Sequence, residues 1–397
     1  MLSVKRMKFL DELLGPIVCF FLYWHNLVFN TFFGLRKREI PAIVRKILII
    51  KFFGMGSIIL AGGMLRSLRK RFPGVHTTIL TFAGNKDICE RINLIDEVIT
   101  IKTKSLPSFL ISLLQAISRI RREKYEISLD LEFFAKSSSI IQYLCATPIR
   151  VGYFLVQHGI ILKMLWRGDL LTYNVYYNPH RHVSEVFSAL AYALGAEPAD
   201  LAPAEIALRK EDEIRLKATL AQQGITESDR FFCLNINASS LALERRWPMQ
   251  NYAELIRQLE DKGYFIILTG EQDDTDYVRD FLIHNKFGSK VKDLSGKLDL
   301  GGLIALLKKA RLLVTNDSGP LHLAVSIGTP TVSLFGPETP ERFGASDSNK
   351  HKAFYVRIYC SPCLNVLNQK TAPCNGDNEC MKRIPVNDVL KAVESFL

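Results

Sequence analysis

Several features that mark common classes of protein are missing from this sequence of 397 residues. No small-residue cleavage site follows the apolar run that starts at Leu13, which argues against a cleavable secretory signal. The glycine turn at 54–56 lacks the third glycine of a dinucleotide-binding fingerprint, because Ile59 stands there, so a dinucleotide oxidoreductase is disfavoured. An acidic excess is missing too, since 51 Lys and Arg face 40 Asp and Glu and give a net charge of +11. This balance suggests an anionic partner, with a solvated basic surface as the alternative.

Length and composition indicate a folded protein of two domains. A chain of 397 residues exceeds what one hydrophobic core usually serves. Hydrophobic residues make up 48% of the chain and charged residues 23%, which is typical of globular rather than disordered proteins.

The N-terminal segment, residues 1–45, is expected to associate with a membrane. No charged residue stands between Leu13 and Leu35, a run long enough to span a bilayer. A polar stripe that includes His25 and Asn26 runs down one side, and basic clusters flank the run at both ends. This pattern suits the headgroup region of an anionic membrane, so we favour a helix in the membrane plane over a span. A helix packed on the protein's own surface is the third alternative.

After Arg45, short apolar runs alternate with amphipathic stretches, which predicts an α/β fold with doubly wound parallel sheets. The first series predicts strands at 46–53, 75–82, 96–101, 125–132 and 148–154, and helices at 57–71, 106–122, 135–144 and 182–194. A stretch rich in Ala and Pro at 195–208 is the predicted linker. The second series predicts strands at 230–238, 264–270, 311–316 and 329–336, and helices at 251–262, 274–285, 301–309 and 320–327.

These patterns predict the domain organisation. After the segment 1–45 we expect Rossmann-like domains at 46–205 and 206–345, facing a cleft, and then a four-cysteine loop with a C-terminal helix at 346–397. Ligands of open α/β sheets bind outside the carboxyl ends of the strands. Functional residues are therefore expected in the strand-to-helix turns.

The first such turn, "KFFGMGS", carries a pair of glycines. Gly54 and Gly56 allow a sharp turn and a close approach to a ligand. A tight strand-to-helix turn capped by Ser57 is the alternative explanation.

The turn in "TNDSGPLH" gives a stronger signal. Pro320 suits the first position of a helix, and Asp317 or Ser318 can cap that helix. Gly319 removes a side chain where a ligand would approach, and His322 follows one turn later. The free N–H groups and the positive end of the helix dipole predict a phosphate site, with an ordinary capped helix as the alternative.

Two further turns offer matching chemistry at the same edge. "NASSLALERRWP" supplies the Ser239 and Ser240 hydroxyls together with Arg245 and Arg246. "TGEQDD" supplies carboxylates, among them Asp274, which could bind a ribose diol. Phosphate donors, cationic side chains and a sugar-binding acid together indicate a nucleotide-diphosphate site.

The motif "TNDSGPLHLAVSIGTPTVSLFGPETP", residues 315–340, resembles the signature of glycosyltransferase family 9, the heptosyltransferases of lipopolysaccharide assembly. The weaker motifs "ILIIKFFGMGS", "KYEISLDLE", "RVGY", "RRWP" and "ILTGEQDD" follow in that family's order, so the resemblance covers nearly the whole chain after Arg45. It implies the GT-B architecture, with the donor bound by the C-terminal domain and the acceptor by the N-terminal one. It also implies inverting transfer from ADP-heptose, with no metal or other cofactor in the reaction.

The resemblance implies roles for single residues as well. Those expected around the donor diphosphate and sugar are Asp317, Ser318, Gly319, Leu321 and His322. Those expected on phosphate oxygens are Ser239, Ser240 and Arg245, which stands where Lys is common. Asp274, where the family often has Glu, is expected on the ribose.

One position departs from the family pattern. The first turn commonly carries an Asp that activates the acceptor hydroxyl, whereas this sequence has Ser57, which cannot act as a base unaided. Asp130 and Glu132 end a predicted strand at the same edge, and the family often has an uncharged residue at 132. Glu132 is therefore the predicted replacement base, with a structural carboxylate bonded to backbone amides as the alternative.

Four of the eight cysteines sit singly in apolar surroundings, as small core residues do. The other four are clustered, and they are Cys360, Cys363, Cys374 and Cys380. The Cys-x2-Cys pair has metal-knuckle spacing, iron is held by a similar four-cysteine finger in the related autotransporter heptosyltransferases, and zinc suits four thiolates equally well. We expect a structural zinc or iron ion without a catalytic part, against free thiols or disulfides.

The sequence therefore predicts an inverting glycosyltransferase that moves a heptose-like sugar from a nucleotide-diphosphate sugar to lipopolysaccharide or another cell-surface glycan. The expected partners are that donor, a lipid-linked glycan acceptor and an anionic membrane surface, and no nucleic acid. The expected location is cytoplasmic and peripheral on the inner membrane face, with a single span as the alternative. The rival hypothesis, favoured by Ser57, is a non-catalytic assembly partner that binds a nucleotide sugar or a glycan.

Overall fold

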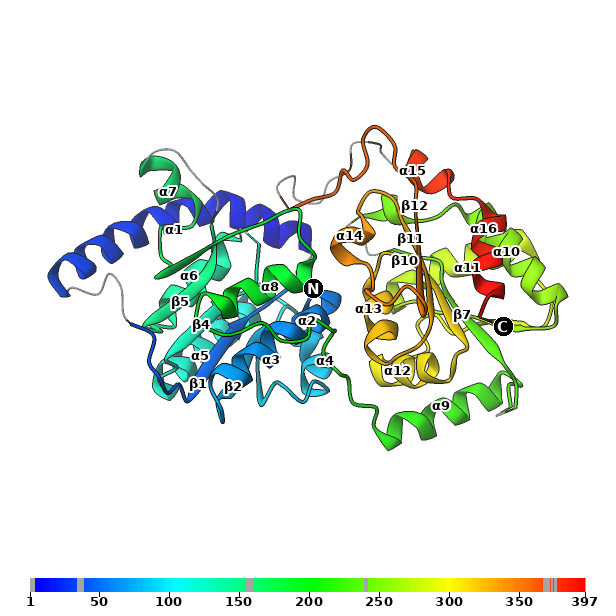
Figure 1. Ribbon diagram of the computed structural model, residues 1–397, viewed down its shortest axis with the longest axis horizontal. Helices are drawn as coiled ribbons and strands as arrows, with labels where there is room; N and C mark the ends of the chain where they lie inside the picture. The colour runs from blue at the N-terminus through cyan, green and yellow to red at the C-terminus, as the bar shows by residue number, and fades with distance from the viewer. Residues whose placement is uncertain are drawn as a thin grey trace. The chain divides into compact units, whose positions relative to one another are not determined.

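The chain forms two compact units, Met1–Ala204 and Glu205–Leu397, seen in a computed structural model. The structure describes residues 4–33, 39–133, 135–154, 160–226, 228–238, 242–366, 372, 374 and 377–396. Each unit is built on one six-stranded sheet (Figure 1).

The sheet of the first unit is parallel and has the strand order β3-β2-β1-β4-β5-β6. Its central strands are apolar runs buried on both faces, as parallel sheets covered by helices require. The strands are β1 (Lys46–Ile50), β2 (His76–Phe82), β3 (Glu97–Ile101), β4 (Ile127–Asp130), β5 (Ile149–Phe154) and β6 (Tyr173–Tyr176). The sequence did not predict β6, whose side chains are only partly buried.

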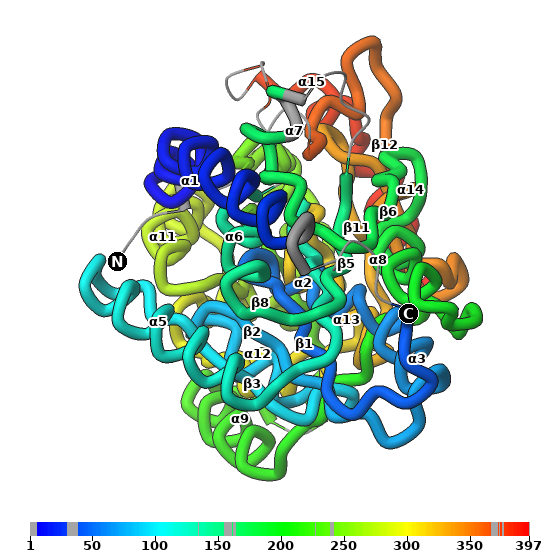
Figure 2. The backbone as a smooth tube through the Cα atoms, turned by 90° about the vertical axis from the view of Figure 1, so that its left-hand side faces the viewer, coloured from blue at the N-terminus to red at the C-terminus, as the bar shows by residue number. Residues whose placement is uncertain are grey.

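Helices cover both faces of this sheet. α5 and α6 share one apolar cluster with β1 and β2, while α3 and α8 contact each other on the other side of the sheet (Figure 2). The helices of the first unit are α1 (Val4–Phe33), α2 (Met55–Leu60), α3 (Gly62–Arg71), α4 (Lys86–Glu90), α5 (Leu106–Glu123), α6 (Lys136–Leu144), α7 (Ile160–Trp166) and α8 (Val183–Tyr192).

The long helix α1 contacts α6 and α7. Asp11 accepts hydrogen bonds from the backbone N–H groups of Lys136 at 3.1 Å and Ser137 at 2.5 Å, in the first turn of α6. The N-cap residue of α6, Ala135, has no side chain that could accept these bonds. Asp11 therefore caps α6 from a different helix, and this contact fixes α1 to the folded unit.

The polar stripe of α1 points toward the protein. His25 Nδ1 lies 2.8 Å from the Tyr143 hydroxyl, and Asn26 donates to the carbonyl of Asp169 at 3.2 Å. Phe29 stacks on the ring of His25, with the ring centres 6.1 Å apart. Many other large apolar side chains of α1 are exposed, namely Phe9, Leu10, Leu13, Leu14, Ile17, Val18, Phe20, Phe21, Trp24 and Val28. By length and composition alone, Arg6–Phe29 could also cross a membrane.

The predicted linker is fixed to the first unit over much of its length. The Arg66 guanidinium donates to the carbonyls of Asp200 and Ala202, and Ala204 N–H donates to the carbonyl of Ile59 at 2.7 Å. A side chain on Gly62 would collide with this segment, because its Cβ would lie 2.4 Å from the Ala204 nitrogen.

The sheet of the second unit is also parallel and has the order β12-β11-β10-β7-β8-β9. In sequence order this is the arrangement of the first unit repeated. The strands are β7 (Phe231–Asn235), β8 (Phe265–Leu268), β9 (Val291–Asp293), β10 (Leu312–Asn316), β11 (Thr331–Phe335) and β12 (His351–Tyr355). The sequence did not predict β9 and β12.

Helices of the second unit complete its core. The largest fully buried side chain is Trp247, which packs with Tyr252 and with residues of α16. The helices are α9 (Lys210–Gln222), α10 (Met249–Asp261), α11 (Thr275–Asn285), α12 (Leu300–Lys309), α13 (Gly319–Ser326), α14 (Pro340–Phe343), α15 (Glu379–Lys382) and α16 (Val386–Glu394).

Replacing Asp11 tests the docking of α1. Asp11→Ala removes the cap of α6 and should lower the free energy of unfolding by about 1 kcal/mol. The matched control is Glu12→Ala, because Glu12 is exposed one residue further along. Thermal unfolding measured by circular dichroism compares the two variants, and equal midpoints would contradict the capping role.

Candidate functional site

Each sheet has one place where the direction of chain progression reverses. In the second unit the strands after β7 add on one side and β10 adds on the other, so the reversal lies between β7 and β10. In the first unit it lies between β1 and β4. The helices that follow the two strands leave toward opposite faces, and the carboxyl ends between them form the usual ligand site of such sheets.

An ion pair occupies this place in the second unit. Asp317 directly follows β10 and is 5% exposed. The Arg245 guanidinium, in the loop after β7, donates to the Asp317 carbonyl at 2.9 Å and to its carboxylate at 3.2 Å. The buried Arg245 Nε has no hydrogen-bond partner among the described residues. Arg245 is thus held beside the start of α13 with a donor to spare.

The start of α13 is open to a ligand. Ser318 is the N-cap residue, but its hydroxyl bonds to the Thr315 hydroxyl at 3.0 Å and makes no cap hydrogen bond in the described part of the chain. Gly319 and Pro320, which follow, are partly exposed. A helix start without a side-chain cap, next to a guanidinium group, suits an anion.

Two predicted donor residues lie deeper than the turn itself. The Leu321 side chain is 1% exposed and belongs to the core, and its N–H donates to the Ser318 carbonyl at 3.2 Å. Leu321 therefore supports the turn and offers little surface to a ligand. His322 is 7% exposed, and its ring lies 6.4 Å from that of Phe343.

Asn316, the last residue of β10, holds the loop after β7 in place. This fully buried side chain accepts hydrogen bonds from Trp247 N–H and from the Tyr252 hydroxyl, both at 3.1 Å. It donates to the carbonyl of Asn237 at 2.9 Å. Sequence analysis missed this residue, although a polar side chain that ends an apolar strand was the available signal.

Asp274 lies in a second polar network at the same edge. Its carboxylate accepts hydrogen bonds from the Asn237 side chain and from Glu271 N–H. Arg246 donates to Asn237 at 2.6 Å and stacks on the ring of Tyr277. Burial raises the pKa of Asp274 above its ordinary value, with the Glu271 N–H bond acting in the opposite direction. Ser239 and Ser240, also predicted to contact phosphate, lie outside the described residues.

In the first unit the predicted glycine turn follows β1. Gly54 has a φ of 85°, a conformation that favours glycine because it has no Cβ. Ser57 lies in α2, with its N–H bonded to the Gly54 carbonyl at 3.0 Å, and Gly56 is buried between them. Ser57 is not the N-cap residue of α2, because Gly54 holds that position.

Glu132 connects the two strands at this reversal. One carboxylate oxygen accepts the N–H groups of Phe52 at 2.7 Å and Phe53 at 3.0 Å. The other pairs with Lys51 Nζ at 3.0 Å, and both side chains are less than 10% exposed. Glu132 therefore anchors the turn after β1, and the oxygen paired with Lys51 has one acceptor position left.

Asp130 has a structural role, unlike the catalytic one considered from the sequence. This fully buried carboxylate accepts hydrogen bonds from Glu132 N–H at 2.9 Å and from the Ser138 hydroxyl at 2.7 Å. It also forms an ion pair with Arg167. Burial raises its pKa, against the effect of Arg167. With both oxygens engaged and no exposed surface, Asp130 cannot contact an acceptor.

Comparison with known proteins agrees with this arrangement. The sequence matches glycosyltransferase family 9 (heptosyltransferase) over residues 113–372, more than half of the chain. The chain belongs to this family. As a family 9 protein it is a glycosyltransferase enzyme, which leaves the rival hypothesis of a non-catalytic partner without support.

Individual relatives extend the match over both units. Lipopolysaccharide heptosyltransferase 2 of Escherichia coli K12 is 23% identical over 338 residues, which is 79% of this chain and 88% of that protein. A glycosyl transferase family 9 structure from Veillonella parvula DSM 2008 has a TM-score of 0.72 and 23% identity, and covers 91% and 99% of the two chains. The structure of Escherichia coli ADP-heptose lps heptosyltransferase II has a TM-score of 0.70 and 19% identity, with 88% and 98% covered. The predicted GT-B architecture is confirmed.

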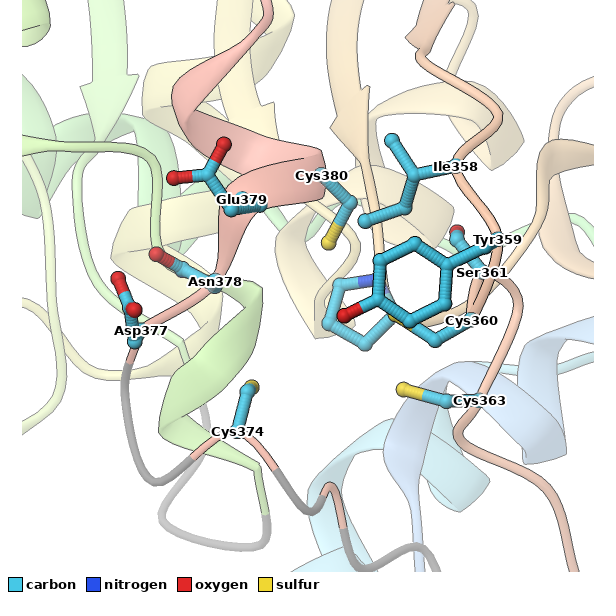
Figure 3. Close-up of a pocket in the computed structure, with 11 residues that line it drawn as sticks. Ile358, Tyr359, Cys360, Ser361, Cys363, Cys374, Asp377, Asn378, Glu379 and Cys380 are labelled. Atoms are coloured by element: carbon cyan, nitrogen blue, oxygen red, sulfur yellow. The ribbon is translucent and has the colours of Figure 1, made fainter.

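The cysteine cluster of this family 9 protein lines a pocket of about 250 Å³ in the second unit. Figure 3 shows Cys363, Cys374 and Cys380 directed into the same space, with Cys360 beside Tyr359. All four are free thiols, and burial raises the pKa of Cys380 to about 11. Within the described ranges, no three or more His, Cys, Asp or Glu side chains are placed to hold a metal ion. The predicted zinc or iron ion thus has no support from the structure.

Replacing Asn316 tests the anchoring of the loop that carries Arg245. Asn316→Ala leaves Trp247 N–H without its buried acceptor and should lower the free energy of unfolding by about 2–3 kcal/mol. Asn349→Ala, at an exposed position of the same unit, should change it by less than about 0.5 kcal/mol. Urea unfolding followed by tryptophan fluorescence measures both, and equal midpoints would exclude an anchoring role.

Proposed function

We propose that this protein is an inverting glycosyltransferase that transfers a heptose from ADP-heptose to a lipopolysaccharide-type acceptor. The names of its relatives support the substrates, since they act on lipopolysaccharide or lipooligosaccharide and one is an ADP-heptose enzyme. The observation that carries the proposal is the Asp317–Arg245 pair at the uncapped start of α13, at the strand reversal of the second unit.

The donor site is proposed in the second unit. The diphosphate would accept hydrogen bonds from the first amides of α13 and from the Arg245 guanidinium. As the bond to the sugar breaks, negative charge grows on the diphosphate, and preorganised donors stabilise that charge without rearranging. Asp317 holds Arg245 in position, and Asp274 lies where it could contact the ribose after small changes in its present hydrogen bonds.

The acceptor hydroxyl is proposed to bind at the turn after β1 in the first unit. Glu132 is the better of the two predicted bases, because its Lys51-paired oxygen keeps one acceptor position and its side chain keeps some exposed surface, whereas Asp130 is fully buried and paired with Arg167. Glu132 would accept the hydroxyl proton while the oxygen attacks the anomeric carbon from the side opposite the diphosphate, which inverts the configuration. Its bonds to Phe52 and Phe53 would fix the carboxylate during this step.

The membrane association of α1 is also a proposal. Its polar stripe bonds to the protein through His25 and Asn26, Asp11 caps α6, and many of its large apolar side chains are exposed. A span would require all these bonds to break, whereas a helix lying in the headgroup region keeps them. We therefore place α1 in the membrane plane, on the cytoplasmic side where nucleotide sugars are available.

Replacing Arg245 tests the donor site. Arg245→Met replaces the aliphatic part of the side chain but removes the guanidinium, and should weaken ADP binding by about 10–100-fold, the value of a hydrogen bond to a charged group. Arg245→Lys should fall in between, because an ammonium keeps the charge without the planar guanidinium. Arg257→Met, on the exposed side of α10, is the matched control. Calorimetric titration with ADP and ADP-heptose measures the affinities, and unchanged values for Arg245→Met would refute this donor site.

Replacing Glu132 tests the base. Glu132→Gln should lower kcat by about 10²–10⁴-fold, the usual contribution of a general base, and leave donor affinity nearly unchanged. Thermal unfolding shows how far the loss of the Lys51 pair destabilises the first unit. The pH dependence of kcat distinguishes a catalytic base from a residue that only positions the turn. Removal of a base abolishes the fall of kcat at low pH, whereas removal of a positioning residue lowers kcat by the same factor at every pH. If kcat still falls at low pH in the Glu132→Gln variant, Glu132 is a structural residue and not the base.

A further inference from the structure

The first half of α5 exposes an apolar stripe that the first unit does not cover. Leu106, Leu110, Ile111 and Leu114 are between 48% and 66% exposed. Their spacing places them on one side of the helix, while the other side is buried through Ser112, Ala116, Ile117 and Ile120. We call these four exposed residues the α5 stripe.

The α5 stripe begins at the edge of the sheet where the acceptor is proposed to bind. α5 starts five residues after β3 ends at Ile101, so its first turn lies at the carboxyl edge. Phe109 in that turn lies 6.4 Å from Phe82, and Phe82 lies 5.2 Å from Phe53, the neighbour of Gly54. This chain of aromatic contacts links the stripe to the glycine turn.

The charge of the protein points to an anionic surface at this unit. Residues 1–204 contain 26 Lys and Arg against 15 Asp and Glu, a difference of +11, whereas residues 205–397 contain 25 of each. Exposed cations also flank the stripe at both ends of α5, and they are Lys102, Lys104, Arg121, Arg122 and Lys124. Apolar side chains between cations match a membrane with anionic headgroups, in which acyl chains bury the former and phosphates pair with the latter.

The helices α5 and α1 belong to the same side of the first unit. α5 and α6 cover one face of the sheet, and α1 packs on α6. Figure 2 shows α1 and α5 together on the left of the unit and α3 and α8 on the right. One lipid surface can therefore contact both helices.

We propose that the α5 stripe is a second membrane contact, which together with α1 holds the carboxyl edge of the first sheet against an anionic lipid surface. A lipid-linked acceptor would then present its sugar to the turn at Gly54 without leaving the membrane. The membrane contact stands on exposure and charge, while the delivery of the acceptor rests on the proposed function.

Vesicle binding tests the contact. The full chain carrying Leu110→Gln and Leu114→Gln should bind vesicles of phosphatidylglycerol and phosphatidylethanolamine at least about tenfold more weakly than the wild type, because two half-exposed leucines no longer enter the lipid. The control carries Ile214→Gln and Ile283→Gln, at positions of the second unit that are 70% and 62% exposed, and should bind like the wild type. Binding of the α5 variant equal to that of the control overturns the proposal.

A sedimentation measurement separates a lipid from a second copy of the chain. If the wild type is a dimer and the α5 variant is a monomer, the stripe is a protein interface and the proposal is wrong. If both have the same mass and only vesicle binding differs, the stripe contacts lipid.

Activity assays separate this inference from the proposed function. With an acceptor embedded in anionic vesicles, the α5 variant should transfer sugar at least about tenfold more slowly, and with a deacylated, water-soluble acceptor it should match the wild type. Equal loss with both acceptors would mean that the stripe acts on catalysis itself, which contradicts a membrane contact. If no variant transfers sugar to either acceptor but the α5 variant loses vesicle binding, the proposed function fails and the membrane contact stands.

Discussion

The reversal of strand order in the middle of each sheet is the constraint on which the site depends. Strands on either side of the reversal send their helices to opposite faces, so no helix covers the carboxyl ends of that strand pair. In this protein the two reversals, between β1 and β4 and between β7 and β10, carry Ser57, Glu132, Arg245 and Asp317, four of the polar residues that the sequence marks as functional. Buried polar groups at these two places need hydrogen-bond partners, and the hydrogen bonds that they form hold the turns of the site in position.

In both units, one buried side chain forms hydrogen bonds between the two strands at the reversal. In the first unit Glu132 follows β4 and bonds the backbone after β1. In the second, Asn316 ends β10 and bonds the loop after β7. A carboxylate accepts several N–H groups, whereas an amide both accepts and donates, which suits a loop that offers carbonyls as well. In both units, therefore, residues predicted to bind ligands lie next to residues that position the turns.

The sequence predicted the central strands of each sheet and one edge strand, β3, but missed the other three edge strands. β1, β4, β7 and β10 are buried on both faces, so their apolar runs were visible without any knowledge of tertiary structure. β6, β9 and β12 are partly exposed edge strands, and β9 has only three residues, so no continuous apolar run marks them. Within the site, the turns at Gly54 and Asp317 followed from glycine and helix-start signals. The bridging role of Asn316 could not be predicted, because it depends on Trp247, which lies 69 residues away in the sequence.

The two units differ in net charge, and this difference matches the different ligands proposed for them. The first unit carries the whole excess of basic residues and both exposed apolar helices, α1 and α5, whereas the second carries as many acidic as basic residues. A neutral unit still suits an anionic nucleotide, because binding depends on a few oriented groups such as Arg245 and the start of α13 rather than on net charge. Long-range attraction is useful only for a surface with many charges, since salt screens single charges beyond about 8–10 Å. The excess of basic residues therefore lies in the unit for which we propose contact with an extended anionic surface, and it is absent from the unit for which we propose binding of a small anion.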